Sequence, residues 1–147
     1  MIILDANLLL YAYNASSDQH DSARRWLERT LAAPLPVGLP WATILAFLRI
    51  STNPRAFPSP LGIEEATAIV SDWLAHPTVA VVEPGERHWE ILRQLLLTVQ
   101  ARGPRVADAH LAALTLEHGA TLCTSDRDFR LFPELPIENP LDQPSKD

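Results

Sequence analysis

Four aspartates are the residues of this sequence best suited to carry chemistry: Asp5, Asp108, Asp126 and Asp128. Each lies next to an apolar segment. Carboxylate oxygens are the ligands that hard divalent ions such as Mg²⁺ and Mn²⁺ take in octahedral geometry. A metal ion held by two or three of them can activate a water and stabilise a phosphate group during its cleavage. The four aspartates therefore suggest a divalent-metal site for phosphodiester hydrolysis.

Each aspartate also has an ordinary structural explanation. Asp5 and Asp108 precede segments with helical spacing, and aspartate commonly caps the first turn of a helix. Asp126 and Asp128 lie in a turn-rich stretch, where aspartate is common in any case. Crowded carboxylates raise one another's pKa, so a cluster persists where a cation fills it or where separate ion pairs divide it. The joint pattern, rather than any single residue, favours a functional site.

Several other chemistries lack the residues they need. The only lysine is Lys146, next to the end, so a phosphate-binding loop, a kinase or a Schiff-base enzyme has no lysine in the body of the chain. The single cysteine, Cys123, permits neither an internal disulfide nor a thiolate zinc cluster. The five histidines show no spacing of the His-Glu-x-x-His kind.

The composition predicts one globular domain. The 147 residues are 47% hydrophobic and 20% charged, which is enough apolar material for a buried core. We expect a single domain over residues 1–139 and a polar tail over residues 140–147. The first residues lack a basic signal segment, and the longest apolar runs fall far short of the ~20 residues that cross a bilayer. With the single cysteine, these features predict a cytoplasmic protein that makes no membrane contact.

The charge balance bears on nucleic-acid binding. A net charge of −6 argues against a protein that coats nucleic acid nonspecifically. The four aspartates supply four of the eighteen acids, and the fourteen others nearly balance twelve bases. An RNA substrate would then be contacted mainly at one metal-bridged site. Arg49, Arg105 and Arg127 are candidates for phosphate contacts, and roles in solubility or surface ion pairs are equally open.

Short apolar runs alternate with segments of helical spacing along the chain. The expected strands cover residues 2–4, 37–39, 79–82, 121–124 and 135–137. The expected helices cover residues 7–13, 19–33 with Asp18 as its cap, 41–52, 63–75, a segment from 89 that stops at Gly103-Pro104, and 108–117. This alternation predicts an α/β fold with a mostly parallel sheet and helices on both faces. The carboxyl ends of such strands meet at one edge, which would bring the aspartates together.

Three segments resemble the PIN-domain family, and in particular the VapC toxins of bacterial toxin–antitoxin pairs. They are the opening Ile2-Ile3-Leu4-Asp5-Ala6-Asn7, the segment from Val106 to Leu114, and the segment from Glu117 to Phe129. Residues 41–49 and Asn139-Pro140-Leu141 resemble one actinobacterial-type branch of the family. The similarity covers nearly the whole chain, and the three segments occur in the family's order and separation.

The resemblance implies a three-layer α/β/α sandwich whose mostly parallel sheet has about five short strands. It implies cleavage of RNA phosphodiesters that depends on Mg²⁺ or Mn²⁺, neutralisation by a small VapB-like antitoxin, and a homodimer. Asp5, Asp108 and Asp126 fall on the family's catalytic metal positions, and Asp128 matches an auxiliary acid. Asn7 and Thr124 match polar neighbours that orient the acids by hydrogen bonds.

One position departs from the family pattern. The family usually carries a glutamate in the helix after the second strand, and this chain has Ala46, followed by Phe-Leu-Arg. Alanine cannot ligate a metal, so the site would hold one ion instead of two or borrow a carboxylate from Glu28 or Glu117. The alternative is a catalytically degenerate PIN module that binds RNA or its antitoxin without cutting.

Overall fold

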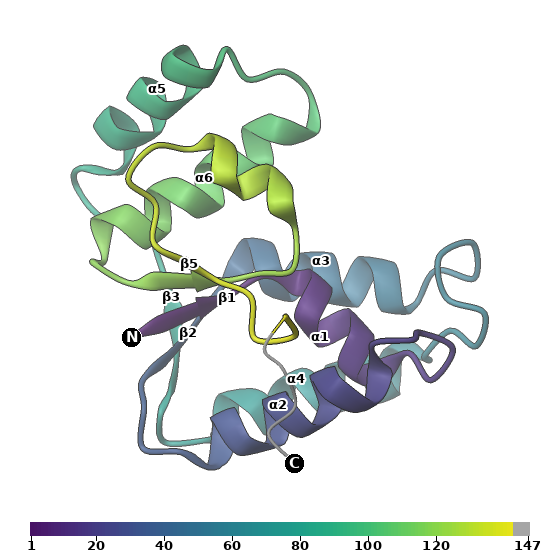
Figure 1. The fold of residues 1–147 in the computed structure, drawn as a ribbon. Helices are drawn as coiled ribbons and strands as arrows, with labels where there is room; N and C mark the ends of the chain where they lie inside the picture. The colour runs from purple at the N-terminus through teal and green to yellow at the C-terminus, as the bar shows by residue number, and fades with distance from the viewer. Residues whose placement is uncertain (143–147) are drawn as a thin grey trace.

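A five-stranded parallel sheet lies between two layers of helices in this computed structural model, which describes residues 1–142 (Figure 1). The strands are β1 (Ile2–Leu4), β2 (Val37–Pro40), β3 (Val79–Val82), β4 (Thr121–Cys123) and β5 (Ile137–Glu138). The helices are α1 (Ala6–Tyr13), α2 (His20–Ala32), α3 (Trp41–Ser51), α4 (Ile63–Ala75), α5 (His88–Val99), α6 (Pro104–Glu117) and the 3₁₀ helix η1 (Arg127–Leu131). The predicted α/β sandwich is confirmed.

The first strand lies in the middle of the sheet. The strand order is β3-β2-β1-β4-β5, and every neighbouring pair is parallel. Ile3 is in register with Gly38 on one side and with Leu122 on the other. The carboxyl ends of β1 and β4 therefore lie next to each other, which places the residues after Leu4 and after Cys123 at one edge.

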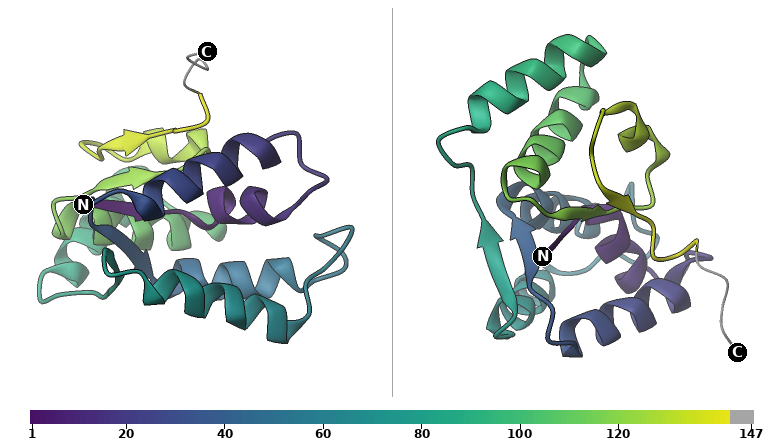
Figure 2. Two further views of the ribbon diagram at one scale, coloured as in Figure 1. Left: turned by 90° about the horizontal axis from the view of Figure 1, so that it is seen from below. Right: turned by 60° about the vertical axis from the view of Figure 1, so that its left-hand side comes forward.

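Each face of the sheet has its own hydrophobic core. Helices α1 to α4 cover one face, and α5 and α6 cover the other, as the two further views also show (Figure 2). Successive strand residues point to opposite faces, so Leu4 and Cys123 belong to the first core and Ile3 and Leu122 to the second. Strands buried on both faces explain the continuous apolar runs of the sequence.

Gly38 is required by the packing of the sheet. A Cβ atom at this position would collide with the Val82 side chain and would lie 3.1 Å from Ile3 Cγ1. The close packing of β3, β2 and β1 therefore requires that β2 carry no side chain at this point.

Four details of the predicted elements were wrong. Helix α2 has Gln19 as its N-cap without a side-chain hydrogen bond, so Asp18 does not cap it. Helix α5 ends at Val99, and its C-cap Gln100 adopts the left-handed conformation, so the helix stops before Gly103-Pro104. Helix α6 begins at Pro104 rather than at Asp108, because proline is favoured in the first turn of a helix. The last strand begins at Ile137, two residues later than expected.

The end of the described chain packs on the domain. Leu141 contacts the first core, so the predicted tail begins inside the fold. The rest of that predicted tail, residues 143–147, lies outside the described residues. Among residues 1–142, no helix combines the length and apolar character needed to cross a membrane.

Candidate functional site

Asp5 is fixed at the carboxyl end of β1. Its backbone N–H donates to the Cys123 carbonyl at 3.0 Å, which extends the β1–β4 pairing by one residue. Its side chain caps α1, because Oδ1 accepts a hydrogen bond from the Ala6 N–H at 2.8 Å. Burial raises the pKa of Asp5, and Asp126 raises it further, while hydrogen bonds from Thr124 and Ala6 partly offset the rise. Asp5 therefore both caps a helix, as its position in the sequence suggests, and lies at the candidate metal site.

Thr124 joins the carboxyl ends of the two central strands. Its hydroxyl donates to Asp5 Oδ2 at 2.7 Å and accepts a hydrogen bond from the Asp126 N–H at 3.0 Å. The side chain is buried, so no water competes for these bonds. One hydroxyl thus holds Asp5 in place and fixes the backbone from which Asp126 projects.

Asp126 and Asp128 begin the 3₁₀ helix η1. Asp126 Oδ1 accepts a hydrogen bond from the Asp128 N–H at 2.9 Å, which caps the helix and leaves Oδ2 open to another partner. The Asp128 carboxylate is exposed and lies 4.0 Å from the Arg105 guanidinium. This cap explains why an aspartate occurs at the turn before η1. The Asp126 Oδ2 atom is left available as a ligand for a metal ion.

Asp108 approaches this edge from another layer. It lies in the second turn of α6, half-buried, instead of at the helix cap. Its pKa is raised to about 6, first by burial and then by the negative charges of Asp126 and Asp5, while Arg105 opposes the rise. These electrostatic contributions show that the carboxylates of α6, β1 and the β4–η1 turn share one region of the protein.

The donor chemistry of this region fits a hard divalent ion. Four carboxylates lie near one another, and Arg105 is the cation that counteracts them in the charge balance of Asp108. Over residues 1–142, however, no three His, Cys, Asp or Glu side chains stand close enough together to ligate a single ion. A divalent ion would relieve the mutual repulsion, and its binding would require side-chain rotation, most simply by Asp108.

Two supporting residues of the prediction behave differently. Thr124 makes the hydrogen bonds expected of it. Asn7 is half-buried in the first turn of α1, and within residues 1–142 its side chain makes no hydrogen bond to any of the aspartates.

The three candidate arginines also differ. Arg105 lies at the site beside Asp128. Arg127 and Arg130 line a cavity of about 110 Å³ together with Asp126. Arg49 is exposed in the last turn of α3, and no contact within residues 1–142 joins it to the aspartates.

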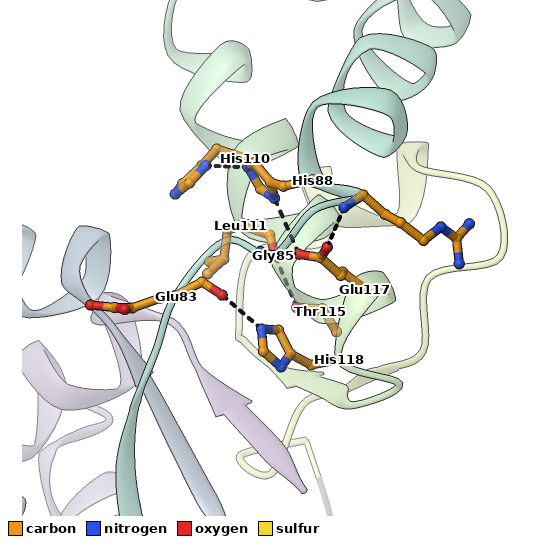
Figure 3. A network of polar contacts seen from close by, with 9 residues as sticks. Glu83, Gly85, His88, His110, Leu111, Thr115, Glu117 and His118 are labelled. Atoms are coloured by element: carbon orange, nitrogen blue, oxygen red, sulfur yellow. Dashed lines mark hydrogen bonds and ion pairs between the residues drawn. The ribbon is translucent and has the colours of Figure 1, made fainter.

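Neither glutamate proposed as a substitute ligand is free for the site. Glu117 accepts hydrogen bonds from the N–H groups of Gly85 at 2.7 Å and Arg87 at 2.9 Å (Figure 3). It thereby holds the β3–α5 connection against the end of α6. Glu28 forms an exposed ion pair with Arg24 at 3.1 Å, one helical turn away.

The histidines on these helices serve the same connection. His118 Nε2 contacts the Glu83 carbonyl oxygen at 2.9 Å, and His88 Nε2 lies 2.9 Å from His110 Nδ1 (Figure 3). A neutral imidazole donates from one nitrogen and accepts at the other, so the pair of rings shares one proton in this bond. Apart from the histidines themselves, no sequence pattern predicts this arrangement.

A polar cavity of about 320 Å³ beside the β4–η1 turn is not predictable from the sequence. The cavity is lined by residues of several loops, including Asp18, Arg127 and Asn139. Polar loop residues carry no periodic pattern, so no sequence signal could have grouped them.

Comparison with known proteins identifies the family and its named relatives. A family model described as PIN domain matches residues 2–135. "Ribonuclease VapC37" of Mycobacterium tuberculosis is 45% identical over 132 residues, which is 90% of this chain and 92% of the relative. "VapC ribonuclease Mb2897" of Mycobacterium bovis is 42% identical over 142 residues, 97% of each chain.

Solved structures show the same fold at low sequence identity. The VapBC2 complex of Rickettsia felis, bound to a DNA fragment from its promoter, has a chain that is 19% identical with a TM-score of 0.70, over 95% of this chain and 98% of that one. VapC20 of Mycobacterium tuberculosis, described as a Sarcin-Ricin loop cleaving toxin, is 20% identical with a TM-score of 0.67, over 92% and 98%.

Proposed function

This chain belongs to the PIN domain family, and on that premise we propose that it is an endoribonuclease, dependent on Mg²⁺ or Mn²⁺, that acts as the toxin of a toxin–antitoxin pair. The observation that carries the proposal is the Thr124 hydroxyl, which holds Asp5 and the Asp126 backbone together at the sheet edge that Asp108 approaches. Relatives that are 37–45% identical are named ribonucleases, which supports RNA as the substrate.

Each residue then has a defined task. Asp5, Asp108 and Asp126 hold the ion, and Asp128 assists from the exposed side. When bound, the ion supplies an activated water and offsets negative charge on the phosphate. Thr124 fixes two of the acids before substrate arrives, so little reorganisation is needed at the moment of reaction. Arg105 and Arg127 lie where they can bind phosphates of the RNA chain.

The proposal includes partners of the chain. Several similar solved structures are toxin–antitoxin complexes, among them the VapBC2 complex and the VapBC-1 complex of nontypeable Haemophilus influenzae. A VapB-like antitoxin is accordingly the proposed inhibitor of this chain, and a homodimer in the cytoplasm is the proposed form of the enzyme.

Two observations favour one alternative function. Ala46 replaces the usual glutamate, and three metal-ligating side chains do not converge within residues 1–142. A catalytically degenerate PIN module with these features would bind RNA or its antitoxin without cutting. The alternative and the main proposal make opposite predictions for cleavage.

Cleavage mapping on total RNA, with and without EDTA, tests the main proposal. We expect fragments that appear with Mg²⁺ or Mn²⁺ and vanish with EDTA. Asp108→Asn should abolish them while its circular dichroism spectrum matches the parent's. The control is Asp72→Asn, because Asp72 is exposed on α4. If Asp108→Asn cuts at the parent's rate, the assigned site is wrong; if the parent binds RNA but never cuts, the degenerate module is correct.

A further inference from the structure

Two cavities lie side by side at the β4–η1 turn. The smaller one, about 110 Å³, is lined by Asp126 and Thr124 of the candidate site. The larger one measures about 320 Å³. Ser125, Arg127 and Asn139 line both, so the larger cavity begins where the candidate site ends.

Structural elements far apart in sequence surround the larger cavity. Tyr11 comes from α1, Asp18 and Gln19 come from the turn before α2, and Ser22 comes from the first turn of α2. Asp142 closes the wall from the C-terminal side. The volume lies at the lower end of the ~300–1,000 Å³ that is typical of small-ligand pockets, and a single nucleotide unit is a ligand of this class.

Hydrogen bonds hold the walls in place without a ligand. His20 Nδ1 lies 3.0 Å from the Tyr11 carbonyl oxygen, which ties the start of α2 to α1. The Gln19 N–H donates to Ser17 Oγ at 3.1 Å. On the opposite wall, Asn139 Oδ1 accepts a hydrogen bond from the Leu141 N–H at 3.0 Å, and Leu141 packs on the core. A preformed pocket loses less conformational entropy when it binds.

The charges of the cavity discriminate between the parts of a nucleotide. Asp18 and Asp142 are exposed residues on the lining of the larger cavity, and their negative charges repel a phosphate group. Arg127 lies on the wall shared with the candidate site, where a phosphate would be attracted. An RNA strand avoids the repulsion and gains the attraction if one of its phosphates contacts Arg127 and an unstacked, uncharged base enters the cavity.

We propose that this cavity binds one nucleobase of the RNA substrate, next to the cleaved phosphodiester, and that the Asp18 carboxylate makes it selective for guanine. Guanine is the base with two adjacent N–H donors on its Watson–Crick edge, and a carboxylate accepts two such donors at once. Gln19 and Ser22 supply further donors and acceptors beside it. The proposal rests on the proposed endoribonuclease function, because it assigns that enzyme's base specificity.

Cleavage of a random-sequence RNA library, followed by sequencing of the new ends, tests the selectivity. We expect guanine to be enriched at one position beside the cut for the parent. Asp18→Asn should reduce kcat/KM for guanine-containing substrates about tenfold and remove the enrichment. Ser22→Trp, which fills the cavity, should do the same.

Asp21→Asn is the matched control, because Asp21 is an exposed aspartate in the first turn of α2 that does not line the cavity. It should keep the parent's enrichment. Unchanged guanine enrichment in both Asp18→Asn and Ser22→Trp would overturn the proposal, as would a parent that cuts without base preference.

A binding measurement separates this proposal from the proposed function. The four 5′-mononucleotides are titrated into the metal-free full chain, and backbone amide resonances are followed by NMR. Stronger binding of the guanine nucleotide, with shifts at residues 18–22 that Asp18→Asn suppresses, supports the cavity as a base site even if the chain cuts no RNA. Equal binding of all four nucleotides, or shifts confined to other regions, overturns it.

Discussion

Thr124 donates a hydrogen bond of 2.7 Å to Asp5, although the two residues are 119 positions apart in the sequence. Parallel pairing of β1 with β4 brings them together, and the Thr124 hydroxyl then links Asp5 to the Asp126 backbone. The candidate site is therefore a product of strand register: a slip of one residue would turn Thr124 to the other face of the sheet.

Replacement of Thr124 by valine should reduce RNA cleavage by about 10–100-fold, a loss typical of residues that support metal ligands. Valine keeps the shape of the side chain but leaves Asp5 Oδ2 without its donor. The control is Thr115→Val, because Thr115 is equally buried and its hydroxyl bonds only the Leu111 carbonyl in its own helix. Both variants should lose about 1 kcal/mol of stability by urea unfolding. Equal cleavage by both variants would contradict a role for Thr124 at the site.

The metal-free protein should lose stability as the pH rises through about 6. Folding raises the Asp108 pKa from 3.8 to about 6 by burial and by the neighbouring aspartates, so the folded state holds this proton over the window in between. The stabilising contribution is complete below pH 3.8 and lost above about pH 6. Because Asp108 is partly solvated, screening reduces the effect to about 1 kcal/mol.

Urea unfolding in EDTA at pH 4.5 and pH 7.5 measures this effect. Asp108→Asn, which cannot ionise, should gain stability relative to the parent at the higher pH. Added Mg²⁺ should stabilise the parent more than the variant at pH 7.5. A stability difference between parent and variant that is the same at both pH values would refute the assigned pKa rise.

Introducing the glutamate that the family usually carries should strengthen metal binding. Ala46 is half-buried on α3, one turn after Thr43, whose hydroxyl bonds the Leu4 carbonyl just before Asp5. Ala46→Glu should lower the Mg²⁺ dissociation constant about tenfold, because each added carboxylate raises the charge of the ligand set. Calorimetry measures it. Ala42→Glu is the control on the same helix, since Ala42 is exposed; equal gains in both variants would show a general charge effect.

Gly38→Ala should destabilise the fold by about 1–3 kcal/mol, which is the usual cost of overpacking. The added methyl group would meet the side chains of Val82 on β3 and Ile3 on β1. The matched control is Gly62→Ala at the start of α4, where the nearest atom is Glu64 Oε2 at 3.5 Å and the backbone is extended. Urea unfolding of the two variants compares them directly, and similar midpoints would contradict the close packing.

The element order was predictable because proline, glycine and apolar periodicity act locally. The observed α4 and β3 match the predicted ranges 63–75 and 79–82. The sequence misplaces Asp108 because Gly103-Pro104 is typical of the end of one helix, whereas in the structure it begins the next. Gly103 has a positive φ of 55°, and Pro104 then opens α6.

The positions of Asp5 and Asp126 at the site were predictable because the ends of the strands before them could be predicted from the sequence. Asp5 and Asp126 follow apolar runs, and parallel strands bring such residues to one edge. The dual role of the Thr124 hydroxyl and the capture of Glu117 by two backbone N–H groups depend on tertiary contacts between distant segments. No local pattern encodes such contacts. The sequence alone therefore could not show that Glu117 binds the backbone of a loop instead of a metal ion.

The central position of β1 also sets the timing of assembly during protein synthesis. The middle strand of the sheet, β1, is synthesised before both of its neighbours, and one of them, β4, follows only after β2 and β3. At about 5–20 residues per second, Thr124 follows Asp5 by about 6–24 s. A growing chain therefore has no assembled acidic site. If the chain is the proposed toxin, its own messenger and ribosome meet an assembled site only after β4 has been synthesised.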